Sequence, residues 1–108
     1  MLPKEDFMER VERVRIIVGF PLPVSSAARC PAYNAKVSAT GEKGPHTTGR
    51  AIDFKVHGAL AFKVVEAMLA EGFRGIGVSQ KGPISERFIH GDDLPDELGR
   101  PRPWVWSY

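Results

Sequence analysis

The sequence predicts a small α+β domain in which two helices accompany an antiparallel sheet. Two observations lead to this class. Two segments repeat their apolar residues with the period of a helix, and short segments of alternating or apolar character follow them along the chain. The chain has 108 residues, of which 43% are hydrophobic and 26% charged, as in ordinary globular proteins. No repeat or long linker divides it, so we expect one domain over residues 1–108.

The first expected helix covers residues 5–18, and charged residues lie between its apolar positions. These positions are Phe7, Val11, Val14 and Val18. Gly19 suits the left-handed residue that follows a helix, and Pro21 prevents continuation. A second helix is expected over residues 59–70.

Strands are expected where short apolar or alternating segments stand between glycine and proline residues. The expected strands cover residues 51–56, 75–79, 87–90 and 103–108. Residues 38–49 contain several glycines and a proline among polar residues, so they are expected to form an exposed loop.

Composition excludes several classes of protein and narrows the possible metal ligands. No apolar run approaches the roughly 20 residues of a membrane span, and no secretory signal is visible at the N-terminus. The single cysteine, Cys30, excludes an intramolecular disulfide and a multi-cysteine zinc site. A metal would therefore be held by carboxylates and by some of the three histidines, His46, His57 and His90.

The net charge of +2 does not indicate a nucleic-acid partner, because the basic residues are scattered. They cluster only at Arg100 and Arg102, close to Trp104 and Trp106, which we interpret as a solvated turn before a buried aromatic strand.

The Gly75-x-Gly77 pair lacks the third glycine of a nucleotide loop, and two glycines in a strand more often mark a bulge or a close backbone approach.

Asp53 is a candidate site residue because it interrupts an apolar segment. His46 stands seven residues earlier, and a turn at Gly49 would let the two side chains converge. A buried carboxylate needs a partner. That partner is either a nearby cation, Arg50 or Lys55, or something bound jointly with His46.

His90 is the second candidate, since it follows an apolar pair and precedes Gly91 and Asp92. Along an unbroken strand, Glu86, His90 and Asp92 would share one face. One carboxylate could then orient the ring while the other handles protons. The alternative is an ordinary strand-end histidine bonded to a neighbouring carboxylate. His57 has no such neighbours and is expected at the surface.

Three collinear segments resemble motifs of a known family. Residues 24–34 (VSSAARCPAYN) are similar to an S-G-Y-R-C/S-P-x-x-N segment, and residues 46–53 (HTTGRAID) to an H-x-x-G-x-A-x-D motif. Residues 75–78 (GIGV) and 88–92 (FIHGD) are similar to G-[IV]-G-[IV] followed by F-[IV]-H-x-D. The family is that of the zinc D-Ala-D-Ala carboxypeptidases and L-Ala-D-Glu endopeptidases with the hedgehog-type fold, and the length suits its short phage-type members.

The resemblance implies a zinc site formed by His46, Asp53 and His90, with Arg29 binding a carboxylate of the peptide substrate. Two imidazoles, a carboxylate and a water make an open four-coordinate zinc site. Cys30 would then be a packing residue beside Arg29.

The chain departs from the family pattern at two positions. Gly44 stands where the family usually has serine, and Arg87 stands where it has the catalytic Asp or Glu. We therefore expect the general base to be Glu86, with Asp92 as the alternative.

The expected function is hydrolysis of peptidoglycan stem peptides, by a D,D-carboxypeptidase or by an endopeptidase of the endolysin type. The alternative is a non-catalytic zinc module of the same fold, including a virion-associated one. A chain without a signal would be cytoplasmic at synthesis and, if phage-derived, would reach the cell wall with a holin or another export partner.

Overall fold

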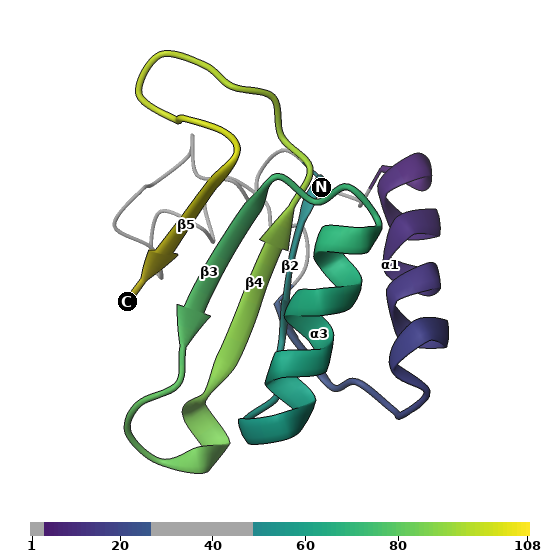
Figure 1. Cartoon of the computed structure of the whole chain (residues 1–108), viewed down its shortest axis with the longest axis vertical. Helices are drawn as coiled ribbons and strands as arrows, with labels where there is room; N and C mark the ends of the chain where they lie inside the picture. Colours follow the sequence, from purple (N-terminus) through teal and green to yellow (C-terminus); the bar gives the residue numbers. More distant parts are fainter. Residues whose placement is uncertain (1–3, 27–48) are drawn as a thin grey trace.

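The computed structural model describes residues 4–26 and 49–108, in which two helices cover one face of a five-stranded sheet (Figure 1). The elements in chain order are α1 (Glu5–Val18), β1 (Val24–Ser26), β2 (Ala51–Phe54), α3 (Gly58–Ala70), β3 (Gly75–Ser79), the 3-10 helix η3 (Ile84–Glu86), β4 (Phe88–Asp92) and β5 (Trp104–Ser107). The expected α+β class is confirmed. Among these residues, no helix is long and apolar enough to cross a membrane.

Helix α1 has the boundaries that its apolar period predicts. Its four repeating apolar side chains are all buried. Gly19 follows with φ of 75°, and its N–H donates to the Arg15 carbonyl at 2.9 Å. This left-handed residue closes the last turn at little steric cost because glycine has no Cβ.

The sheet has the strand order β1-β2-β4-β3-β5, with β4 at its centre. Neighbouring strands are antiparallel except β3 and β5, which run parallel. The expectation of a purely antiparallel sheet is thus corrected to a mixed one. After β4 the chain returns to the start of β3, where the Trp104 N–H donates to the Arg74 carbonyl at 2.9 Å (Figure 1). A strand that starts there must run in the direction of β3.

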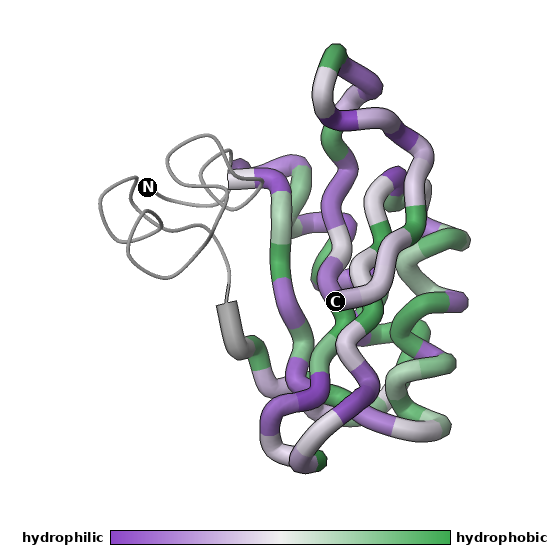
Figure 2. The backbone as a smooth tube through the Cα atoms, turned by 90° about the vertical axis from the view of Figure 1, so that its left-hand side faces the viewer, coloured by the Kyte–Doolittle hydropathy of each residue, from purple (hydrophilic) through white to green (hydrophobic). Residues whose placement is uncertain are grey.

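The two faces of the sheet differ in chemistry. Ile52, Ile76 and Ile89 face the helices and join the buried apolar cluster that includes the α1 and α3 side chains. Since side chains alternate along a strand, Asp53 and His90 lie on the opposite face. Figure 2 views the sheet nearly edge-on, with the helices on one side only. The sheet therefore separates an apolar core from a polar site.

Candidate metal centre

One row of residues across the sheet brings the candidate site together. In register, Asp53 on β2 lies opposite His90 on β4, His90 opposite Gly77 on β3, and Gly77 opposite Trp106 on β5. A Cβ at Gly77 would lie 2.7 Å from the Trp106 Nε1 atom. The missing side chain leaves room for the Trp106 ring, whose centroid is 5.1 Å from that of His90. A close backbone approach was expected at the two glycines. At Gly77 it is the side chain of Trp106, not another backbone, that lies close.

His90 lies between two carboxylates. Its Nδ1 atom is 3.0 Å from Asp53 Oδ1, and its Nε2 atom is 2.7 Å from Asp92 Oδ2. Their exposed fractions are 1% for His90, 8% for Asp53 and 0% for Asp92. Burial would lower the pKa of His90, but the hydrogen bonds to Asp53 and Asp92 raise it above its usual value.

Asp92 is held by a second partner, Arg102. The guanidinium donates from Nε to Oδ1 and from a terminal nitrogen to Oδ2, each at 2.9 Å. The Leu94 N–H also donates to Oδ1, at 3.4 Å. Burial opposes ionisation of Asp92, yet the hydrogen bonds from His90 and Arg102 prevail and lower its pKa to about 2. Asp92 is therefore an anion at neutral pH, with both oxygens engaged.

The Asp53–His90 pair fits a zinc ion. Two ligand atoms on a tetrahedral zinc lie about 3.3 Å apart, close to the 3.0 Å between Asp53 Oδ1 and His90 Nδ1. Asp92 would accept the remaining ring N–H, as carboxylates behind metal-bound histidines commonly do. Within residues 4–26 and 49–108 no three His, Cys, Asp or Glu side chains are grouped to hold a metal. The other expected ligand, His46, lies outside the described residues, as do Arg29 and Cys30.

The turn expected before Asp53 is present at Gly49. This residue is buried and has φ of 78°, a left-handed conformation that favours glycine. Arg50 follows it and forms ion pairs with Asp6 at 2.6 Å and with Asp93 at 3.0 Å. Arg50, one of the cations considered for Asp53, thus pairs with Asp6 of α1 and with Asp93, which follows β4.

Glu86 does not lie in the same strand as His90. Strand β4 begins at Phe88, so the same-face argument for Glu86, which requires an unbroken strand from Glu86 to Asp92, does not hold. Glu86 instead ends η3, whose turn is closed by a hydrogen bond from its N–H to the Pro83 carbonyl, and its side chain is exposed. Arg87 donates from Nε to the Gly82 carbonyl at 3.0 Å. The expected surface position of His57 is confirmed.

Arg102 and Trp106 are the site residues that the sequence reasoning missed. We interpreted the tail as a solvated turn before a buried strand, but the Arg102 side chain is only 4% exposed. In β5, by contrast, Trp104 is 55% exposed. The signal for Arg102 was Asp92, a carboxylate in a buried strand that requires a cationic partner.

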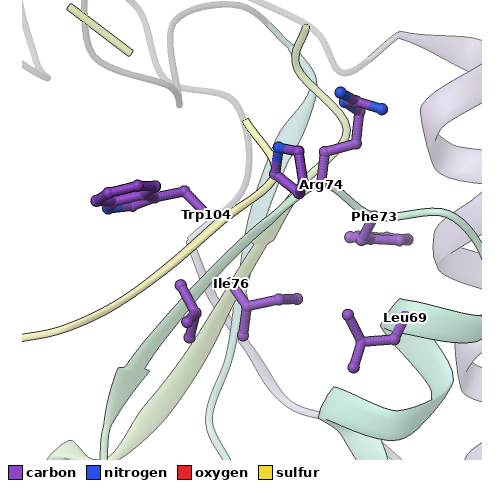
Figure 3. A pocket seen from close by; sticks show the side chains of 7 residues that line it. Leu69, Phe73, Arg74, Ile76 and Trp104 are labelled. Carbon is purple, nitrogen blue, oxygen red and sulfur yellow. The ribbon is translucent and has the colours of Figure 1, made fainter. Parts of the chain in front are cut away.

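A pocket of about 260 Å³ lies on the helix side of the sheet (Figure 3). Its lining includes Leu69, Phe73, Arg74, Ile76 and Trp104. It offers neither the carboxylates nor the histidines that metal binding or proton transfer needs. The chemistry of the described residues is therefore concentrated on the opposite face.

Comparison with known proteins identifies the family. A family model described as peptidase M15 matches residues 2–92, which include Asp53, His90 and Asp92 but not Arg102. No curated protein and no solved structure gives a significant match. Because the family model spans most of the 108 residues, the chain belongs to the peptidase M15 family.

Proposed function

We propose that the chain is a zinc-dependent peptidase that hydrolyses the stem peptides of peptidoglycan. The observation that carries this proposal is the buried pair of Asp53 and His90, set 3.0 Å apart in a chain of a peptidase family. His46 would complete the protein ligands, and Arg29 would bind a carboxylate of the peptide, as the motif resemblance implies. The same resemblance supports peptidoglycan as the substrate and the cell wall as the place of action.

The residues of the site divide the work. A bound zinc ion would lower the pKa of a coordinated water to about 7 and polarise the scissile carbonyl. Asp92 would accept the His90 Nε2–H and so direct Nδ1 to the metal. A general base must reach the proton that it abstracts, and both oxygens of Asp92 are already engaged by Arg102 and His90, which makes Asp92 unsuited to that role. We therefore assign the base to Glu86, whose side chain is open to solvent.

Metal analysis of the purified protein tests the zinc site. We expect about one zinc per chain. His90→Ala and Asp53→Asn should each remove the metal and the hydrolysis of purified cell walls, because each loses a ligand. His57→Ala is the matched control and should keep both. Full zinc occupancy in His90→Ala would contradict the proposed site. Mass spectrometry of the digest distinguishes loss of a terminal D-alanine from cleavage within the stem.

Glu86→Gln tests the assignment of the base. The variant should bind zinc as the wild type does and lose hydrolysis by about 100-fold or more, the usual contribution of a positioned general base. Undiminished turnover would show that Glu86 is not the base.

A non-catalytic zinc module is the second candidate. It is favoured by Arg87, which occupies the position where the resembling enzymes carry their acid. A wild-type protein that binds zinc and cell walls, yet releases no peptide fragment, would establish this function instead.

A further inference from the structure

We propose that Arg102 is a positioning residue of the metal centre, which acts through Asp92 to hold the His90 ring with Nδ1 toward Asp53. The inference deepens the proposed function and rests on it for the identity of the metal. Arg102 lies beyond residue 92, where the match to the family model ends.

The first support is a continuous chain of hydrogen bonds. The Arg102 fork bonds both oxygens of Asp92, and Asp92 Oδ2 also bonds His90 Nε2 at 2.7 Å. A guanidinium that bonds both oxygens fixes the plane of a carboxylate, which a single point charge does not do. The orientation of Asp92, and with it that of the imidazole, is therefore set by Arg102.

The second support is that Arg102 is itself held in place. Its backbone N–H donates to Asp96 Oδ1 at 2.9 Å, and a terminal guanidinium nitrogen donates to the Pro101 carbonyl at 2.8 Å. The Trp106 ring lies against both ends of the chain of contacts, 5.0 Å from the Arg102 guanidinium and 5.1 Å from the His90 ring. Because Arg102 is itself fixed, it can hold the Asp92 carboxylate in a defined position.

The third support comes from the glycines of β3. A Cβ at Gly75 would lie 2.5 Å from Arg102 Nε, and one at Gly77 would lie 2.7 Å from Trp106 Nε1. Neither glycine has positive φ, so backbone conformation does not require glycine there. Glycine at both positions instead leaves the space that Arg102 and Trp106 fill.

Without Arg102, the ring would have two competing orientations. Asp53 and Asp92 each lie within hydrogen-bond distance of one ring nitrogen of His90, at 3.0 and 2.7 Å. An Asp92 carboxylate that is free to rotate would no longer define which nitrogen faces Asp53. The expected consequence is weaker metal binding, because the histidine must be ordered when the ion binds.

The test compares Arg102→Met and Arg102→Lys with a matched control, Arg100→Met. Arg100 lies in the same loop and pairs with Glu97 at the surface. The first readout is the His90 Nε2–H signal in zinc-free protein by nitrogen-edited NMR, assigned with His90→Gln. The second readout is the dissociation constant for zinc measured by competition with a chelator. Neither readout requires enzymatic activity.

In Arg102→Met we expect the Nε2–H proton to exchange too fast to be seen and zinc affinity to fall about tenfold, the lower end of the range for residues behind a ligand. Arg102→Lys should be intermediate in both readouts, and it decides the question if Arg102→Met does not fold. Arg100→Met should match the wild type.

An Arg102→Met protein with an unchanged Nε2–H signal and unchanged zinc affinity overturns the inference, even if its melting temperature falls. If the wild type binds no zinc, the proposed function is contradicted. Loss of the Nε2–H signal in Arg102→Met would in that case still support the positioning role.

Discussion

The imidazole of His90 has a carboxylate beside each ring nitrogen. A proton and a zinc ion would therefore compete for the same nitrogen, Nδ1. A proton on Nδ1 satisfies Asp53 when no metal is present. Zinc requires the same nitrogen to be unprotonated, so its binding displaces that proton. Asp92 accepts from Nε2 in both cases. Affinity for zinc should therefore rise with pH across the titration of His90.

The stability of the zinc-free protein should show the same linkage. The pKa of Asp92 falls from 3.8 to about 2, so its contribution of about 2 kcal/mol is present above 3.8 and is lost as the pH falls toward 2. The pKa of His90 is raised above 6.5, so its contribution is complete below 6.5 and is lost as the pH rises through the folded-state pKa. Urea unfolding between pH 2 and 9 should show greatest stability at about pH 4 to 6.5.

Variants separate the two limbs of that profile. Asp92→Asn should flatten the acidic limb, and His90→Gln should flatten the alkaline limb, because each removes the titrating group. A wild-type protein that gains stability between pH 6.5 and 9 would contradict the assignment of a raised His90 pKa.

At the scale of elements, β4 serves both faces of the sheet. His90 and Asp92 point to the polar face, while Gly91 between them lies against Met68 of α3 and against Phe73, in the segment between α3 and β3. A Cβ at Gly91 would lie 2.6 Å from Met68 Sδ and 2.8 Å from Phe73 Cδ2. The absence of a side chain at Gly91 thus lets the helix pack directly on the strand that holds the site.

Gly91→Ala should accordingly destabilise the protein by about 1 to 3 kcal/mol, the usual cost of overpacking a filled core. The measurement is chemical unfolding at fixed pH. The double variant with Met68→Ala provides the control, because removing the Met68 side chain makes room for the new methyl group. We expect the double variant to lose less than the sum of the single changes. Strict additivity would show that the Met68 contact is not the cause.

The elements were predictable where one pattern determines them. Helix α1 has the predicted boundaries because its apolar period and Gly19 act locally, and β3 spans the predicted residues 75–79. The strand expected over residues 87–90 is present as β4, which begins at Phe88 and runs two residues further, to Asp92. Parallel pairing of β5 with β3 depends on the path of a loop, which local patterns do not encode.

The site was predictable in part for the same reason. Asp53 and His90 stood out as polar residues in apolar strands, and the register places them opposite each other. Arg102 did not stand out, because a basic residue between prolines resembles a solvated turn until its partner is known. The relation of Asp92 to Arg102 is a contact between segments, and one sequence does not display it.

At the scale of the whole molecule, Asp93 joins both helices to the end of the sheet. Arg50, which precedes β2, donates to the two carboxylate oxygens of Asp93 at 3.0 and 3.2 Å. The Nε atom of Arg10, in α1, lies 3.5 Å from Asp93 Oδ2. Arg10 also donates to the Glu71 carbonyl, after α3, at 2.8 Å. Adjacent residues at the end of β4 thus have separate tasks, since Asp92 supports the metal centre and Asp93 connects the layers.

Asp93→Asn tests this division of tasks. The Asp93 side chain is 5% exposed, but Arg50 and Arg10 are 31% and 38% exposed, so solvent screens part of the interaction. We expect a loss of about 1 to 2 kcal/mol in unfolding free energy, with zinc affinity unchanged because Asp92 and Arg102 are untouched. Glu97→Gln, which removes a surface ion pair with Arg100, should cost less than about 0.5 kcal/mol. If Asp93→Asn lowered the unfolding free energy no more than Glu97→Gln does, Asp93 would not connect the layers. If it weakened zinc binding as much as Arg102→Met does, the tasks of Asp92 and Asp93 would not be separate.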